Sequence, residues 1–195
     1  MKSPSLYALL GMIALLIIEL ALNGFEPVQA VSASLPVFVL LAEIALPFLL
    51  LAVVLRGKFP LIDVVAEDGQ MLAFLVATTA MLGSLFYQFG QGLVPCELCW
   101  FQRICMYPLV FIIGVSLWKR QSDVFYYAVP LCLIGAAISV YQYYAQMFSV
   151  VLSCSGGTDC SQIQTISFGY ITIPLMALTA FLSITLLLYL RKWKK

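Results

Sequence analysis

Long apolar runs separated by short polar segments dominate the hydropathy pattern of this chain. Six of these runs approach the length of about 20 residues that an α-helix needs to cross the hydrocarbon core of a membrane. Because lipid offers the backbone no hydrogen-bonding partner, each spanning run is predicted to be helical. The predicted spans are roughly residues 5–22, 35–55, 70–90, 100–118, 125–147 and 169–190. The pattern therefore predicts an all-α integral membrane protein with six transmembrane helices.

The composition supports this fold class and removes several classes of function. Hydrophobic residues make up 63% of the 195 residues and charged residues only 10%. The mean hydropathy of +1.04 is outside the range of soluble domains of this size. The net charge of +1 and the lack of a basic tract argue against nucleic acid as a partner. The chain has no histidine, so histidine metal sites and histidine general bases are excluded.

The segments between the spans alternate between the two sides of the membrane, and the basic residues divide unevenly. One side receives nine of the ten lysines and arginines, namely Lys2, Arg56, Lys58, Lys119, Arg120, Arg191, Lys192, Lys194 and Lys195. The other side receives only Arg103. The positive-inside rule makes the first side cytoplasmic, so we expect both termini inside and a location in the plasma membrane. The same alternation places four cysteines outside, where disulfides persist: Cys96, Cys99, Cys154 and Cys160.

The chain divides into an N-terminal addition and a unit that contains every cysteine. Residues 1–69 are predicted to form two transmembrane helices and a cytoplasmic connector, and residues 70–195 supply the other four helices. The first apolar run, followed by Val28-Gln29-Ala30, loosely resembles a secretory signal with a small-residue cleavage site. The length of the run and the presence of Glu19 within it favour a retained helix.

The candidate chemistry begins with two cysteines and an arginine at the start of the fourth apolar run. Cys96 and Cys99 form a Cys-x-x-Cys pair, which can close into an easily reduced disulfide, and Arg103 follows Cys99 by one helical turn. If a helix begins near Pro95, Cys99 lies in its first turn, where the helix dipole and the charge of Arg103 favour a thiolate. Glu97 opposes this effect. The pattern predicts a thiol redox site at the membrane boundary.

A second cysteine pair follows the fifth apolar run. Cys154 and Cys160 enclose five residues, among them Gly156 and Gly157, which allow a tight turn. This spacing is enough to bring the two cysteine α-carbons within bridging distance. We expect the loop to be exposed and within reach of a soluble protein.

The other cysteines and the carboxylates inside the spans are expected to be structural. Cys105 and Cys132 are predicted to be packing residues, because free cysteine behaves as a small apolar side chain. Glu19 and Glu43 lie inside apolar runs, where a carboxylate is costly. A structural hydrogen bond is the favoured role for each carboxylate, and a proton route is the less favoured one.

Together these motifs resemble the DsbB/BdbC-type disulfide bond formation proteins over about residues 70–190. The resemblance is carried by Cys96-Glu97-Leu98-Cys99-Trp100-Phe101-Gln102-Arg103, Met106-Tyr107-Pro108, the Cys154…Cys160 loop and Phe168-Gly169-Tyr170-Ile171-Thr172-Ile173-Pro174. Vitamin K epoxide reductase-like proteins share the chemistry but carry their motifs in a different order. The resemblance implies a four-helix transmembrane bundle core, preceded here by two extra helices. It also implies a thiol oxidase that passes electrons from an extracytoplasmic thioredoxin-fold, DsbA-like protein to a quinone.

The resemblance further implies roles for individual residues. The expected catalytic residues are Cys96, Cys99, Cys154, Cys160 and Arg103, with Cys154 the sulfur that the partner attacks. The residues expected at the quinone, which is either ubiquinone or menaquinone, are Cys99, Arg103 and Gln142. Many relatives carry a histidine at the position of Gln142. A glutamine can hydrogen-bond a quinone carbonyl but cannot relay a proton near neutral pH, so the proton route is left without an assigned residue.

Three other functions compete with a thiol oxidase. In the first, the four outer cysteines bind zinc or copper, which predicts reduced, metal-bound thiols in the purified protein. In the second, the protein is a transmembrane carrier of thiol reductant, for which Cys132 is the one weak candidate on the cytoplasmic side. In the third, the disulfides only staple two loops, which predicts that mild dithiols leave them intact.

Overall fold

The computed structural model describes residues 11, 27–54, 60–121, 123–150, 154 and 159–193. Within these ranges the chain is helical apart from short connections and one isolated β-bridge. The first predicted span, residues 5–22 with Glu19, lies outside the described residues except for Gly11.

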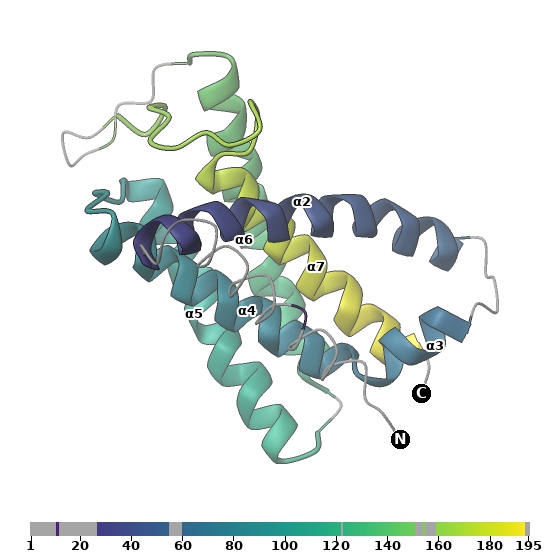
Figure 1. Ribbon diagram of the computed structural model, residues 1–195. Coiled ribbons are helices and arrows are strands. Elements are labelled where there is room, and N and C mark those ends of the chain that lie inside the picture. The colour runs from purple at the N-terminus through teal and green to yellow at the C-terminus, as the bar shows by residue number, and fades with distance from the viewer. Residues whose placement is uncertain are drawn as a thin grey trace.

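Five helices of the described part are long and apolar enough to cross a membrane (Figure 1). They are α2 (Pro27–Val54), α4 (Gly69–Leu85) with its π-helical extension η1 (Phe86–Gly90), α5 (Glu97–Trp118), α6 (Val124–Met147) and α7 (Ile173–Trp193). A short helix, α3 (Pro60–Glu67), lies within the predicted connector and packs against α7. This arrangement is that of an all-helical, multi-pass membrane protein.

The last helix begins later than its apolar run predicts. Ser167 and Ile171 exchange two backbone hydrogen bonds of 2.8 and 2.9 Å, which form an antiparallel bridge. Between them, Phe168 and Gly169 have φ angles of +52° and +80°. Left-handed backbone angles do not continue a right-handed helix, so α7 begins at Ile173, four residues after the approximate start predicted near residue 169.

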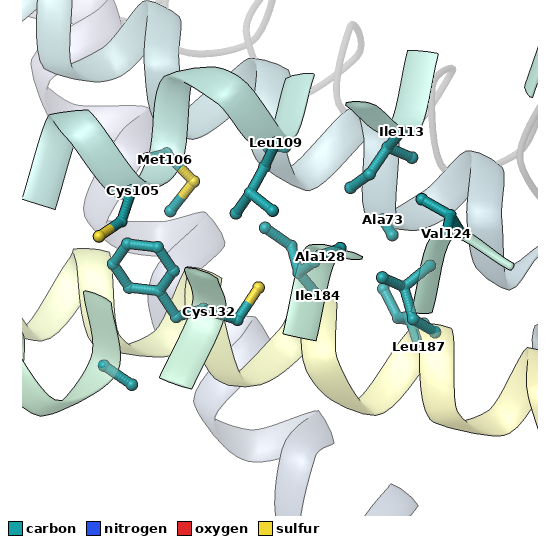
Figure 2. Packing of buried hydrophobic residues seen from close by; sticks show 14 residues of the cluster. Ala73, Cys105, Met106, Leu109, Ile113, Val124, Ala128, Cys132, Ile184 and Leu187 are labelled. Carbon is teal, nitrogen blue, oxygen red and sulfur yellow. The ribbon is translucent and has the colours of Figure 1, made fainter. Parts of the chain in front are cut away.

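The buried hydrophobic cluster lies between α4, α5, α6 and α7 (Figure 2). In Figure 2 Leu109 of α5, Cys132 of α6 and Ile184 of α7 point into this shared interior, and each is fully buried. Cys105 and Cys132 belong to the cluster, with exposed fractions of 5% and 0%, and both are free thiols. Their predicted role as packing residues is confirmed.

Close approach of α6 and α7 depends on a glycine. Gly135 of α6 faces the ring of Phe181 on α7, and a Cβ atom added to Gly135 would overlap with that ring. Phe181 itself is fully buried, and its ring would have to shift to make room for the added atom. Small residues at helix contacts are the usual means by which membrane helices approach closely.

We therefore expect Gly135→Ala to lower the thermal unfolding temperature of the purified protein, at a cost of about 1–3 kcal/mol for overpacking. The matched control is Ala137→Val, which adds carbon atoms on an exposed face of the same helix. An unchanged unfolding temperature in Gly135→Ala would show that α6 and α7 can move apart at little cost in free energy.

Candidate redox site

Cys96 and Cys99 lie at the start of α5, as the spacing predicts. Cys96 is the last extended residue before the helix, with φ −73° and ψ 172°, and its carbonyl accepts a 3.1 Å hydrogen bond from the amide of Trp100. Cys99 therefore occupies the first helical turn. The two sulfur atoms are 3.0 Å apart, as a hydrogen-bonded pair of free thiols. This placement lets the pair close into a disulfide with little backbone movement.

Gln142 of α6 connects this pair to the second cysteine loop. Its side-chain amide nitrogen donates to the sulfur of Cys96 at 3.1 Å and to the carbonyl oxygen of Cys160 at 3.4 Å. Its amide oxygen accepts a 2.9 Å hydrogen bond from Gln102. Gln142 is only 1% exposed, so these bonds form in a low-dielectric interior where an unmade bond is expensive. The amide therefore fixes both cysteine pairs relative to α6.

The second loop carries the predicted disulfide. Cys154 and Cys160 are bonded to each other, with their α-carbons 6.1 Å apart, which confirms the prediction from their spacing. Cys160 is 1% exposed whereas Cys154 is partly exposed. The bridge thus has a buried end beside Gln142 and an end that faces outward.

Side-chain amides hold the second loop against the rest of the site. Gln164 donates to the carbonyl of Val94, just before α5, at 2.7 Å. Gln146 of α6 donates to the carbonyl of Gln162 at 3.3 Å. A small cavity of about 10 Å³ remains between the Cys96–Cys99 pair and residues of the second loop such as Gln162 and Gln164, and Gln142 lines it. The two hydrogen bonds join residues that are 70 and 16 positions apart in the sequence, so the pattern of apolar residues could not predict them.

Negative charge in the reduced pair is favoured at Cys96. The hydrogen bond with the Cys99 thiol is the main cause that lowers the pKa of Cys96 to about 6 from an ordinary 9.0; burial opposes this shift and the Gln142 amide adds to it. The helix position and Arg103 had favoured a thiolate at Cys99 instead. That expectation was wrong for this arrangement, because the hydrogen bond between the two sulfurs favours charge at Cys96. The Gln142 donor, at 3.1 Å from Cys96 and 3.6 Å from Cys99, adds to this preference.

Arg103 is 8% exposed, and its guanidinium turns toward the end of α4. It donates to the hydroxyl and the carbonyl of Ser84 at 2.9 and 3.0 Å, and also to the side-chain oxygen of Gln88. Gln88 lies in the π-helical turn η1, a type of irregularity that is frequent at functional sites. All three acceptors are neutral, so these hydrogen bonds do not neutralise the positive charge of Arg103. Neither Ser84 nor Gln88 was predicted as a site residue, although their spacing of four places them on one helix face.

A cavity of about 500 Å³ begins at this charge and continues between α2, α4 and α7. Cys99 and Arg103 both line it, which places the two on one cavity wall as their spacing predicts. Gln142 lines instead the small cavity beside Cys96 and Cys99. Its expected contact with a quinone therefore stays a prediction, while its contacts with cysteines are the feature that the sequence analysis missed.

The predicted structural role of Glu43 is confirmed. Its carboxylate accepts a 2.9 Å hydrogen bond from the Tyr170 hydroxyl and a 3.3 Å bond from the Thr179 hydroxyl. The bond to the carboxylate raises the pKa of Tyr170. Glu19, for which the same role was expected, lies outside the described residues.

The described residues do not favour the metal-site alternative. They contain no group of three or more cysteine, aspartate or glutamate side chains placed to hold one ion. In addition, Cys154 and Cys160 are bonded to each other and are not two free thiolates.

Comparison with known proteins places this site in a family context. The family model of the disulfide bond formation protein DsbB matches residues 69–190. A probable disulfide formation protein C 2 from Bacillus anthracis is 43% identical over 126 residues, which is 64% of this chain and 90% of that protein. The disulfide bond formation protein C of Bacillus subtilis is 43% identical over 63% of this chain and 91% of its own length. A probable disulfide formation protein of Coxiella burnetii is 39% identical over 55% of this chain and 76% of its own length. No solved structure matches the chain.

The hydrogen bonds at Cys96 predict an unusual pH dependence for its alkylation. In the protein whose Cys96–Cys99 pair is reduced, we expect the rate of iodoacetamide modification of Cys96, followed by mass spectrometry, to rise around pH 6 and to level off at higher pH. The thiolate is present above a pKa of about 6 and is lost as the pH falls through that value. Gln142→Leu removes a donor and should move the midpoint upward. A midpoint near the ordinary 9.0 in the unmodified protein would contradict this account.

Proposed function

The chain belongs to the disulfide bond formation protein DsbB family, and we propose that it reoxidises an extracytoplasmic dithiol protein and delivers the electrons to a membrane quinone. Family membership makes it a membrane thiol oxidoreductase of disulfide bond formation. The quinone and a thioredoxin-fold, DsbA-like partner are the finer part of the proposal. The observation that carries it is the amide of Gln142, which joins a partly exposed disulfide and the Cys-x-x-Cys pair in one site.

The partner's thiolate attacks Cys154 in this scheme. The partial exposure of Cys154 and the burial of Cys160 support this choice. The attack forms a mixed disulfide with Cys154 and breaks the Cys154–Cys160 bond, so that Cys160 leaves as a thiolate. The partner's second thiol then displaces Cys154 as a thiolate, and the partner departs with its own disulfide.

The electrons next reach Cys96 and Cys99. When these two cysteines are oxidised, the Cys160 thiolate attacks Cys96, and Cys99 leaves as a thiolate. Cys154 then attacks Cys160, which restores the Cys154–Cys160 disulfide and releases Cys96. The Gln142 amide, which donates to the Cys96 sulfur at 3.1 Å, supports this last step because a hydrogen-bonded thiolate is a better leaving group.

The large cavity has the properties that a quinone site requires. Its volume of about 500 Å³ falls within the usual range of small-molecule sites. Cys99 and Arg103 form its polar end, and most of the remaining lining is apolar. A bound ubiquinone or menaquinone supplies a two-electron, two-proton acceptor that returns the two thiols to a disulfide. Arg103 holds positive charge where negative charge develops during the transfer.

The proposal also includes the orientation of the protein in the membrane and the division of the chain into two parts. The distribution of lysine and arginine supports cytoplasmic termini and extracytoplasmic cysteine loops in the plasma membrane. Residues 70–195 form the redox unit, built around a four-helix core, and residues 1–69 are an addition to it. The family match to residues 69–190 supports this boundary.

The electron relay is tested with purified protein, a reduced thioredoxin-fold dithiol protein and a soluble quinone. We expect the quinone absorbance to fall only when all three are present. Cys99→Ser and Cys154→Ser should each abolish turnover, because each removes one sulfur of a required disulfide. Cys105→Ala is the matched control, since Cys105 is a packing residue.

Two outcomes would contradict the relay. Quinone loss that survives removal of Cys154 would show that the second loop is not on the electron path. Absence of quinone loss, together with reduced and metal-loaded cysteines in the isolated protein, would favour the metal-binding alternative.

Arg103 is tested separately. Arg103→Met should lower kcat/KM for the quinone by about 100-fold, the usual effect of removing one group that stabilises developing negative charge. Formation of the mixed disulfide between Cys154 and the partner should be unchanged, because it occurs at the other cysteine pair. Lys119→Met, which removes a cation just beyond the opposite end of α5, is the control. Normal quinone kinetics in Arg103→Met would remove Arg103 from the mechanism.

A further inference from the structure

Helix α2 forms one wall of the large cavity, although it lies outside the region matched by the family. The family match begins at residue 69, and α2 ends at Val54. The match also covers 90% of the Bacillus anthracis relative, which leaves that protein less chain than the about 20 residues of a spanning helix. The unmatched part of the Bacillus anthracis relative is therefore too short to form a spanning helix equivalent to α2, so this cavity wall distinguishes the present chain from that relative.

The two faces of α2 have different surroundings. Leu35, Phe38, Val39, Ala42 and Leu49 line the cavity and recur at the spacing of one helix face. Leu41, Ile44 and Phe48 lie on other faces and are 51%, 52% and 68% exposed. The cavity-lining face is thus distinct from the face that is available to lipid.

Polar contacts attach α2 to the rest of the bundle. Glu43 accepts hydrogen bonds from Tyr170, in the turn before α7, and from Thr179, within α7. Thr179 also lines the cavity. Leu35 lies against Gly83 of α4, where an added Cβ would contact the leucine side chain at 3.4 Å. In Figure 1 α2 crosses α7, in agreement with the contacts between these two helices.

The cavity is polar at one end and apolar at the other. Along α4 its lining runs from Leu72 to Gln88, which corresponds to a length of about 24 Å at 1.5 Å per residue. The Gln88 end carries Cys99 and Arg103, and the Leu72 end carries Val65 and Leu187. A site of this shape and polarity suits an amphiphile with a polar ring and a long hydrocarbon tail.

We propose that α2 encloses the isoprenoid tail of the quinone and makes this protein select long-tailed over short-tailed quinones. This inference rests on the proposed function, in which the quinone ring lies at Cys99 and Arg103. The ring contacts come from the matched part of the chain, whereas Phe38, Val39 and Ala42 contact the tail. Loss of these contacts therefore affects the two kinds of quinone unequally.

The test compares binding of a long-tailed isoprenoid quinone with that of a quinone carrying only a short alkyl tail. Full-length protein in lipid nanodiscs is titrated with each, and the Kd is followed by quenching of tryptophan fluorescence. The quinone content of the purified protein, extracted and quantified by chromatography, gives a second readout that does not depend on turnover.

Ala42→Phe places a large side chain in the proposed tail site. We expect its affinity for the long-tailed quinone to fall about 10-fold or more, since expelling two buried methylene groups is worth about that factor. Its affinity for the short-tailed quinone should change much less. Leu41→Phe, at the adjacent exposed position, is the matched control and should leave both affinities unchanged.

A second pair of variants covers the case in which Ala42→Phe does not fold. Phe38→Ala removes a cavity-lining ring, and Phe48→Ala makes the same change on a part of α2 that is 68% exposed. Only Phe38→Ala should weaken binding of the long-tailed quinone.

Several outcomes would overturn the inference. Equal loss of both affinities in folded Ala42→Phe would show that α2 acts only on the overall structure. Unchanged affinities would place the tail elsewhere. Equal binding of both quinones by the unmodified protein, with phospholipid retained in place of quinone, would identify an acyl chain as the occupant. Failure of the unmodified protein to bind either quinone would instead count against the proposed function itself.

Discussion

The buried amide of Gln142 is the interaction on which the arrangement of the site depends. Its nitrogen contacts the sulfur of Cys96 and the carbonyl of Cys160, and its oxygen is bonded to Gln102. A neutral amide can donate and accept at once without the large cost of burying a charge. It therefore links two cysteine pairs from separate loops inside a low-dielectric interior. Because an unmade bond at this depth is costly, the same contacts hold the two pairs in one position.

The position of Gln142 depends in turn on how α6 packs. Gly135 and Gln142 are seven residues apart, two helical turns, so they lie on the same face of α6. The close approach at Gly135 and Phe181 sets the depth and rotation of that face against α7. Packing in the middle of the membrane thus determines where a polar group meets the cysteines at its edge. The remaining free cysteines, Cys105 and Cys132, belong to this packing and not to the chemistry.

The hydrogen-bond partners of Arg103 and the residues that line the large cavity likewise come from several helices. Arg103 comes from α5, but its hydrogen-bond acceptors, Ser84 and Gln88, come from the end of α4 and its π-helical turn. The cavity that begins there is closed by α2, which Glu43 attaches to Tyr170 and Thr179. The site is therefore a product of several helices, and α2, which precedes the residues matched by the family, contributes to it.

The sequence by itself determined the features that depend on local pattern. Apolar length predicted all five described spans, with end errors of at most four residues except at the start of α2, which begins at Pro27 and not near residue 35. Spacing placed Cys154 and Cys160 within bridging distance and Cys99 in a first helical turn. The start of α7 was missed because two left-handed residues interrupt an apolar run without changing its hydropathy. The tertiary structure decided the partners of Gln142, Arg103 and Glu43, which lie from 15 to 136 residues away along the chain. Hydropathy encodes which residues enter the membrane, but these contacts depend on helix rotation and depth, which only the packed bundle sets.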